Sequence, residues 1–540
     1  IKSTTQPGND PLSKQYDFWC SRKNEDIDKL IELAGGLFME ATAASQQNVI
    51  GDSIKLNLVF NNRSGLGIGG VVVSVFGNDY TLEGIKTNEN KVQTVTVAIN
   101  DTIRASQPYW LDKGLARGNG SFDVSDQSLI GKAEDYKLIA NFRVTMGNEA
   151  YDFVKPILFK YTDPVKGELY QPVQLVNPVF VTSRQHLIIF KNDDKGQKRE
   201  LGFTVQFNRN IADSSKFMYD YNGNSSVVFD SMLHVSRAEI KNIKIIVNSD
   251  SLKKDSREYL GGRFSSKGLK GDQVSSLTRI KYDHIPDIYY NYHDRITVLK
   301  MDLKTTGKVV GYISGAGDKV PQALEQMGYK VILLKQADII PGNLNQFDAI
   351  ITGVRAYNVN EWMNNVYGTL MDYVKEGGTL FTQYNTSSQF GPMKSRIAPY
   401  PFTISRGRIT DEESSIKFLL PNHPALNYPN KITEKDFEGW VQERSIYNAE
   451  TIDSNYQRIL SMKDADEDEQ EGSLIIANYG KGKFVYSGLV FFRELPAGVP
   501  GAYRLFANLI APNDPGKPGN EKKGDKAAGL KQRARRTGGR

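Results

Sequence analysis

The sequence predicts a multidomain protein of α and β structure, with an N-terminal helix, two β-sandwich domains and then an α/β domain. Two observations predict this order. Between residues 52 and 292, apolar and polar side chains alternate over short runs separated by Gly, Asn and Asp, which is typical of β-sandwiches. After residue 296, short apolar runs alternate with segments of helical spacing, which is typical of an open sheet with helices on both faces.

At 540 residues the chain is too long for a single hydrophobic core, so we expect several domains. The composition shifts place a linker and helix at 1–48, β-sandwiches at 49–165 and 166–294, the α/β domain at 295–512 and a basic tail at 513–540. No segment is long and apolar enough to predict a transmembrane helix. The single cysteine, Cys20, excludes an intramolecular disulfide and a Cys-rich zinc site.

The net charge of +6 is concentrated in the tail, where Asp514–Arg540 carries nine Lys or Arg against three Asp or Glu. Because this segment has almost no apolar residues, we expect it to be disordered. A basic tail can bind nucleic acid, but a solvated tail explains the same composition, and we predict no nucleic-acid partner.

The first predicted helix begins at a cap on Asn24 and carries apolar residues at three- and four-residue spacing. Such a stripe must be buried, so we expect the helix to pack on a domain that precedes Ile1. The apolar stripe consists of Ile27, Leu30, Ile31, Ala34, Leu37 and Phe38.

The strands of the first sandwich are predicted where the period is two, most clearly over residues 54–60, 71–75, 95–99 and 138–144. Residues 163–178 contain several prolines and glycines and are predicted to form an extended connector. The second sandwich follows and ends near Tyr292. Its aromatic segment Ile285–Tyr292 fits a buried edge strand better than a carbohydrate-stacking platform.

The α/β domain is organised around residues 308–334, which predict a strand, a glycine turn, a helix and a second strand. Asp318 is placed to cap the helix, and Gly328 to end it. A third strand at Ala349–Thr352, a helix over residues 362–374 and a strand at Thr379–Thr382 continue the alternation. Units of this kind form parallel strands through right-handed crossovers.

Polar side chains follow the predicted strands of this domain. In open α/β sheets, ligands bind outside the carboxyl ends of the strands, so this crevice is the candidate site. Its ligand-binding candidates are Asp318, Arg355, Asn358, Gln383 and Asn385.

Two later clusters mix aromatic residues with paired charges, at Trp440–Arg444 and at Phe491–Gly501. A Glu beside an Arg in such a loop either binds a polar ligand or ties the loop to its own domain, and the second role is favoured here because no nucleophile accompanies the charges. The candidates from these clusters are Glu443, Arg444, Arg493 and Glu494.

The usual catalytic and nucleotide-binding motifs are missing from the sequence. It contains no GxSxG, P-loop or HExxH pattern. The turn Gly315–Asp318 has a carboxylate where a dinucleotide site would place phosphate, which argues against nucleotide binding. The five histidines are scattered, and none is spaced as a metal ligand. We therefore predict no catalytic residue and no metal ligand in this chain.

A series of segments in order carries a family resemblance. YDHIP at Tyr282–Pro286, GYISGAGDKVPQAL, GVRAYNVNE, GGTLFTQYNT, ITDEES, PNKITEKDFEGWVQER and FFRELPAGVPGAYRLFANL resemble the C-terminal half of large Bacteroidota proteins of the PIG-L/LmbE deacetylase family. LAGGLFMEATA, QPYWL and DPVKGELYQP resemble the middle of the same proteins. The resemblance spans Tyr16 to Pro512.

The resemblance implies a parent protein that removes acetyl groups from N-acetylglucosamine-type amides with zinc. The family's catalytic domain, with its Ala-His-Pro-Asp-Asp type motif, precedes this region, and the nearest string here, Asn422–Leu426, lacks both aspartates. The resemblance therefore implies that zinc belongs to a deacetylase domain outside this chain, which becomes its expected partner. It also implies a periplasmic or secreted location.

The α/β domain resembles the flavodoxin-like folds of class I glutamine amidotransferases and ThuA-like proteins. Amidotransferases of that class place a cysteine on a turn between a strand and a helix, whereas the comparable positions here are Thr382–Asn385. Glutaminase activity is therefore not expected.

Three hypotheses follow for the function. The main one is a non-catalytic accessory region that binds glycan or organises the enzyme. The alternative is a sugar-acting hydrolase in the α/β crevice, which uses Asp318, Glu443 or Glu494 together with Arg355 or Arg493. A pure scaffold, the third, would bind no ligand.

Overall fold

The computed structural model describes residues 11–113, 122–132, 138–221, 224–270, 273–387 and 396–512. The chain divides into two compact units: unit 1 comprises residues up to Gln185, Glu200–Ile246 and Tyr259–Ile296, and unit 2 comprises His186–Arg199, Val247–Glu258 and residues from Thr297. The predicted basic tail lies outside the described residues, and the predicted domain boundaries stay predictions. None of the described helices has both the length and the apolar character needed to cross a bilayer.

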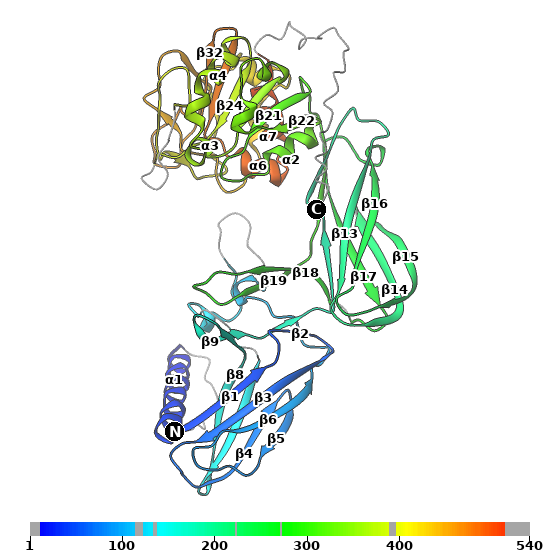
Figure 1. The fold of residues 1–540 in the computed structure, drawn as a ribbon, viewed down its shortest axis with the longest axis vertical. Coiled ribbons are helices and arrows are strands. Elements are labelled where there is room, and N and C mark those ends of the chain that lie inside the picture. Colours follow the sequence, from blue (N-terminus) through cyan, green and yellow to red (C-terminus); the bar gives the residue numbers. More distant parts are fainter. Residues whose placement is uncertain are drawn as a thin grey trace, which may run out of the picture. The chain divides into compact units, whose positions relative to one another are not determined.

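Unit 1 begins with an eight-stranded sheet, in the order β5-β4-β7-β8-β1-β3-β6, with β9 paired to β8 (Figure 1). The long strand β8 joins the two halves, because its first part pairs with β7 and its second part with β1 and β9. The strands are β1 (Leu37–Ala43), β3 (Ser53–Asn62), β4 (Ile68–Val75), β5 (Asn78–Leu82), β6 (Lys91–Ala98), β7 (Ile139–Met146), β8 (Glu149–Asp163) and β9 (Gly167–Pro172).

The alternating residues of these strands share one hydrophobic core. Ile54, Leu56, Leu58 and Phe60 of β3 are each fully buried, and they cluster with residues of β4 and β7 such as Val73, Phe142 and Val144. The strands that the period of two predicts over residues 54–60, 71–75 and 138–144 are therefore confirmed.

The first helix differs from its prediction. Helix α1 spans Pro11–Ala34 and so begins well before Asn24, while Leu37 and Phe38 lie in β1. Ile27 and Leu30 are at least half exposed. The prediction was wrong because an Asn at a polar position resembles a cap in sequence, although helical residues continue on both sides of it.

The predicted connector at residues 163–178 is also wrong. Residues 167–172 form β9, which pairs antiparallel with β8, and β10 (Gln174–Val176) pairs with β2 (Gln47–Val49). The Asp163 carboxylate accepts hydrogen bonds from the N–H groups of Val165 and Lys166, both at 2.8 Å. These two hydrogen bonds and Gly167, which has φ of 82°, form a hairpin turn. The number of prolines and glycines in the segment does not predict this turn.

The second β region contributes a sheet with the order β16-β13-β11-β18-β19 and the strand group β17-β14-β15. Phe203 on β13 contacts Phe217 on β14, with ring centroids 5.7 Å apart. The aromatic segment forms β19 at the edge of its sheet, where Tyr289 is buried. The strands are β11 (Val179–Ser183), β13 (Lys198–Phe207), β14 (Ile211–Tyr221), β15 (Asn224–Val235), β16 (Ile240–Asn248), β17 (Ser256–Ser266), β18 (Val274–Ile280) and β19 (Ile288–Tyr292).

Unit 2 is built around a seven-stranded sheet with the order β22-β21-β23-β24-β33-β32-β30 (Figure 1). The five strands from β22 to β33 are parallel, and β32 and β30 are added antiparallel. The strands are β21 (Val309–Ile313), β22 (Lys330–Leu333), β23 (Ala349–Thr352), β24 (Thr379–Gln383), β30 (Tyr456–Arg458), β32 (Leu474–Tyr479) and β33 (Gly482–Ser487).

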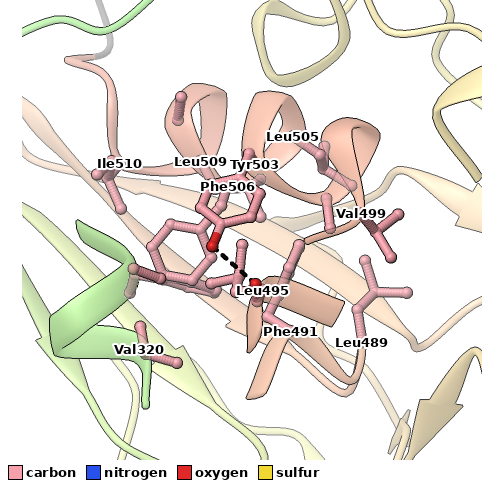
Figure 2. Packing of buried hydrophobic residues seen from close by; sticks show 14 of the residues in the cluster. Val320, Leu489, Phe491, Leu495, Val499, Tyr503, Leu505, Phe506, Leu509 and Ile510 are labelled. Atoms are coloured by element: carbon pink, nitrogen blue, oxygen red, sulfur yellow. Dashed lines mark hydrogen bonds between the residues drawn. The ribbon is translucent and has the colours of Figure 1, made fainter. Parts of the chain in front are cut away.

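Successive residues of the parallel strands point to opposite faces, and helices cover both faces. Ile351, Phe381 and Val485 pack with α2 (Val320–Met327), α6 (Phe491–Ala497) and α7 (Pro500–Ile510). Ile350, Leu380 and Phe484 pack with α4 (Met363–Lys375). Figure 2 shows the first core from close by, where the Tyr503 hydroxyl donates to the Leu495 carbonyl at 2.7 Å.

The predicted elements of this unit are confirmed. The strand at Ala349–Thr352 has the predicted bounds, and α2 buries Val320, Leu324 and Met327 before Gly328 ends it with a left-handed φ of 100°. The protein is therefore a mixed α/β chain with several β-sheets and a C-terminal, largely parallel sheet flanked by helices.

Candidate functional site

The carboxyl ends of β21 and β23 are joined by internal hydrogen bonds. The Tyr312 hydroxyl donates to the Asp318 carboxylate at 2.6 Å, and the N–H groups of Val320 and Val354 donate to the same carboxylate at 3.0 and 3.2 Å. Gln383 donates to the Tyr312 hydroxyl at 3.3 Å. The N-cap residue of α2 is Lys319, so the predicted cap at Asp318 lies one residue too early. The Asp318 carboxylate still accepts from the N–H of Val320, the first helical residue, and both of its oxygens accept hydrogen bonds from within the fold.

No space remains between these two strand ends. The Ala316 N–H donates to the Val354 carbonyl at 2.8 Å, and a Cβ on Gly315 would lie 2.0 Å from that carbonyl oxygen. Glycine is required here because backbone approaches backbone. The part of the predicted crevice that lies between β21 and β23 is therefore filled.

Asn358 and Asn385 also act within the fold. Asn385 accepts from the Tyr357 N–H at 3.0 Å, and Asn358 exchanges two hydrogen bonds with the backbone of Thr386, both at 2.9 Å. Both asparagines are buried. They hold the short helix α3 (Ala356–Val359) against the segment that follows β24.

Arg355 is different, because its side chain is not tied to the fold in this way. It follows β23 with a left-handed backbone, at φ 58° and ψ 24°, and its N–H donates to the Tyr384 carbonyl at 2.8 Å. Its Nε is buried and has no hydrogen-bond partner among the described residues. Left-handed conformations cost a non-glycine residue roughly 1–2 kcal/mol, and such residues concentrate at functional sites.

Glu443 lies between two arginines. Its carboxylate is 2.6 Å from Nη2 of Arg408 and 3.1 Å from Nη2 of Arg493. The Glu443 side chain is only 1% exposed, whereas those of Arg408 and Arg493 are 51% and 32% exposed. Arg408 lies on β26 (Arg408–Ile409), which pairs with β28 (Ser445–Ile446) and so brings Arg408 beside Glu443. The buried carboxylate therefore orients two arginines whose side chains remain partly exposed.

Arg444 and Glu494 belong to the interior. Arg444 is buried, donates to the Ser414 carbonyl at 3.0 Å and lies 5.7 Å from the ring centre of Trp440. The Glu494 carboxylate accepts from the Val441 N–H at 3.1 Å. Burial raises the pKa of Glu494 to about 8, although the Val441 N–H and the charge of Arg444 act in the opposite direction. Glu494 is therefore largely protonated at neutral pH.

Three aromatic rings lie beside the arginines. Tyr384 stacks on Tyr447 with ring centroids 5.6 Å apart and contacts Phe492 at 5.3 Å, and all three rings are half-buried. Arg493 lies over the Phe492 ring at 5.2 Å. Burial raises the pKa of Tyr384, while the charges of Arg355 and Arg493 lower it. These residues form what we term the strand-end cluster: Arg355, Tyr384, Arg408, Glu443, Tyr447, Phe492 and Arg493.

The topology explains why these residues meet. β23, β24 and β33 are adjacent and parallel, and Arg355, Tyr384 and Arg493 each follow the carboxyl end of one of them. Of the nine ligand-binding candidates, the structure brings Arg355, Glu443 and Arg493 together in this cluster. It places the others in hydrogen bonds within the fold: Asp318, Asn358, Gln383, Asn385, Arg444 and Glu494.

Sequence reasoning missed four members of the cluster. Tyr384 lies between the candidates Gln383 and Asn385, and Phe492 lies within the segment Phe491–Gly501. Both would have been found if aromatic as well as polar residues at these places had been taken as candidates. Arg408 and Tyr447 carry no such signal, because β26 and β28 are only two residues long.

Cavities among the described residues also occur away from this cluster. One of about 50 Å³ in unit 1 is lined by Gln107, Trp110 and Asp287 among others. One of about 260 Å³ in unit 2 is lined by Glu450, Arg458 and neighbouring residues. Within the described segments, no three His, Cys, Asp or Glu side chains are grouped so that they could hold a metal ion.

No family model matches the chain, and no curated protein matches it. Solved structures give distant matches. They include the exo-β-1,4-mannosidase Op5Man5 from Opitutaceae bacterium strain TAV5 (13% identity, TM-score 0.23, 38% of this chain and 35% of that chain). A β-galactosidase from the Antarctic haloarchaeon Halorubrum lacusprofundi matches at 13% identity with a TM-score of 0.20, over 36% of this chain and 30% of that chain.

The transglutaminase of red sea bream matches at 11% identity with a TM-score of 0.20, over 50% of this chain and 33% of that chain. The chain thus spans about a third of the length of the first two matched structures, at 35% and 33%. TM-scores of this size show only a weak structural resemblance, which extends to carbohydrate-active enzymes and assigns no function.

Proposed function

We propose that this chain is the non-catalytic, glycan-binding accessory region of a zinc-dependent deacetylase related to the PIG-L/LmbE family. In this proposal, the N-terminal helix and two β-sandwiches precede a flavodoxin-like, amidotransferase-like domain. The partner is a deacetylase domain of the same protein, which holds the zinc, and the location is periplasmic or secreted.

The observation that carries the binding role is the strand-end cluster. Half-buried rings of Tyr384, Tyr447 and Phe492 lie next to guanidinium groups with unused donors. Saccharides are bound by this combination, because sugar rings pack on aromatic faces while hydroxyl groups accept from fixed donors. The order β22-β21-β23-β24-β33 supports the flavodoxin-like assignment, because it matches the 2-1-3-4-5 order of that fold.

The alternative of a sugar-acting hydrolase has less support, because the three carboxyl groups that it would use already form hydrogen bonds or ion pairs within the fold. Asp318 is bound by Tyr312 and two backbone N–H groups, Glu443 by two arginines, and Glu494 by the Val441 N–H. A general acid and a nucleophile both need access to the sugar, and Glu494 has no exposed surface.

A glutaminase role is also not supported. The residues that follow β24 contain no cysteine, and Cys20 lies in α1. The sharp strand-to-helix turn with a left-handed residue occurs instead after β23, where it presents Arg355. A guanidinium group at such a turn binds ligands but does not attack them.

The proposal is tested by combining a hydrolysis assay with thermal unfolding. The purified chain is expected to leave N-acetylated sugars intact and to unfold at a higher temperature with a saccharide ligand, whether or not zinc is present. A ligand at 100 times its dissociation constant adds about 2.7 kcal/mol. Chelator-sensitive hydrolysis of the N-acetyl group would overturn the non-catalytic role, and an unchanged unfolding temperature with every saccharide would overturn the binding role.

A further inference from the structure

The charges of the strand-end cluster do not balance. Arg408 and Arg493 share the single carboxylate of Glu443, and the described residues include no ion-pair partner for Arg355. The pairs therefore leave an excess of positive charge at the carboxyl ends of β23 and β33.

Two buried donors in the cluster are unused. The Nε atoms of Arg355 and Arg493 are both buried, and neither has a hydrogen-bond partner among the described residues. Burying a polar group without a partner is unfavourable, and most buried groups in folded proteins are paired. Unpaired donors on two arginines of one cluster point to a ligand that accepts from both.

The positions of these arginines are fixed by the fold. The left-handed backbone of Arg355 is held by the hydrogen bond from its N–H to the Tyr384 carbonyl. Arg493 is oriented by Glu443 at 3.1 Å and by the Phe492 ring at 5.2 Å. Preorganised donors bind an acceptor without losing side-chain entropy at that moment.

We propose that the strand-end cluster binds an oxyanion-bearing saccharide, with the oxyanion on Arg355 and Arg493 and the sugar ring against Tyr384 and Phe492. The oxyanion is the carboxylate of a uronic acid or a sulfate ester, since guanidinium forks match the geometry of both. This inference rests on the proposed function and adds the class of glycan. It predicts that neutral saccharides are poor ligands.

The test is calorimetric titration of the whole chain with three oligosaccharides of equal length: an oligouronate, a sulfated neutral oligosaccharide and the unsulfated neutral one. The expected result is binding of at least one acidic ligand, weakened by added salt, with the neutral ligand at least about tenfold weaker. Comparison of the two acidic ligands identifies the source of the oxyanion.

The variants isolate the site. Arg355→Met is expected to weaken the acidic ligand at least about tenfold, because a hydrogen bond to a charged group contributes roughly 1.5–3 kcal/mol. Arg355→Lys keeps the charge and is expected to bind with intermediate affinity, which separates lost recognition from misfolding. Arg458→Met is the matched control, because it removes the same charge from the edge strand β30, where Arg458 pairs with Glu471.

The outcomes separate the two proposals. Equal affinity for neutral and acidic ligands, with no effect of Arg355→Met, would overturn this inference and leave the glycan-binding role in place. Binding of none of the three ligands would overturn both. Equal losses in Arg355→Met and Arg458→Met would show a nonspecific charge effect and would also overturn the inference.

Discussion

At the scale of single residues, Arg355 combines a left-handed backbone with an unpaired buried donor, and both features cost stability. We predict that Arg355→Gly increases the free energy of unfolding by roughly 0.5–1 kcal/mol. Glycine removes the left-handed strain, and its larger freedom in the unfolded chain offsets part of the gain. Chemical denaturation measures the change. A loss of stability would mean that Arg355 serves the fold rather than a ligand.

Glu494 gives a prediction about pH. Burial raises its pKa from 4.5 to about 8, so between these values the folded protein holds a proton that the unfolded chain has lost. This contribution to stability is therefore complete at low pH and is lost as the pH rises toward 8. Glu494→Gln mimics the protonated carboxyl group.

The variant is expected to show a flatter stability profile than the wild type between about pH 5 and 7, with similar stability at the acidic end of that range. Urea unfolding at several pH values measures both curves. Parallel curves for the two proteins would contradict the raised pKa.

Lys483 gives a prediction of opposite sign. It lies on β33 and is buried, with its Nζ 3.4 Å from the Asn508 carbonyl oxygen, and burial lowers its pKa from 10.5 to about 7. Because the unfolded chain binds this proton more tightly, the buried lysine destabilises the fold at and below neutral pH, and this cost disappears as the pH approaches 10.5.

Lys483→Met is therefore expected to raise the free energy of unfolding by roughly 1–3 kcal/mol near pH 7, with a smaller gain above pH 9. Thermal and urea unfolding of the variant and the wild type test this. A gain that grows with pH would have the wrong sign and would reject the argument.

At the scale of elements, the close approach of the β21 and β23 ends determines where a site can form. A Cβ on Gly315 would lie 2.0 Å from the Val354 carbonyl oxygen, so Gly315→Ala must separate the two strand ends. We expect a loss of roughly 1–3 kcal/mol of stability.

Gly368→Ala is the matched control for this change. Gly368 lies in α4, and a Cβ added there would meet open space, so alanine should stabilise the helix by roughly 0.5–1 kcal/mol. Denaturation curves of both variants measure the difference. Equal effects of the two substitutions would refute the packing argument.

The elements of unit 2 could be predicted from the sequence, and several of unit 1 could not. Strands such as β23 and helices such as α4 can be predicted from the periodicity of their apolar residues and from the glycines that end them, which are local signals. The hairpin at Asp163–Gly167 depends on side-chain hydrogen bonds to the turn, and the start of α1 lies in a polar segment without periodicity. Local patterns do not contain either piece of information.

The candidate site was predictable only in part, for a similar reason. Sequence reasoning finds Arg355 from its place after a predicted strand, and it finds Arg493 from the paired charges of the segment Phe491–Gly501. It does not distinguish them from Asp318 or Asn385, whose side chains bond to the fold. That distinction depends on contacts between segments far apart in sequence, such as the pair of Arg408 and Glu443.

At the scale of the whole molecule, the proposals assign ligand recognition to unit 2 and chemistry to a domain outside this chain. The strand-end cluster lies entirely within unit 2, so binding there does not depend on how the two units are arranged. Glycan recognition should therefore be a property of the isolated chain, measurable without the deacetylase domain.

A crystal structure of the chain with a bound oligouronate or sulfated oligosaccharide would test glycan recognition by the strand-end cluster most directly. We expect an oxyanion within hydrogen-bond distance of the guanidinium groups of Arg355 and Arg493, and a sugar ring against Tyr384 or Phe492. A ligand seated instead in the cavity beside Glu450 and Arg458, with the strand-end cluster unchanged, would contradict the proposed site.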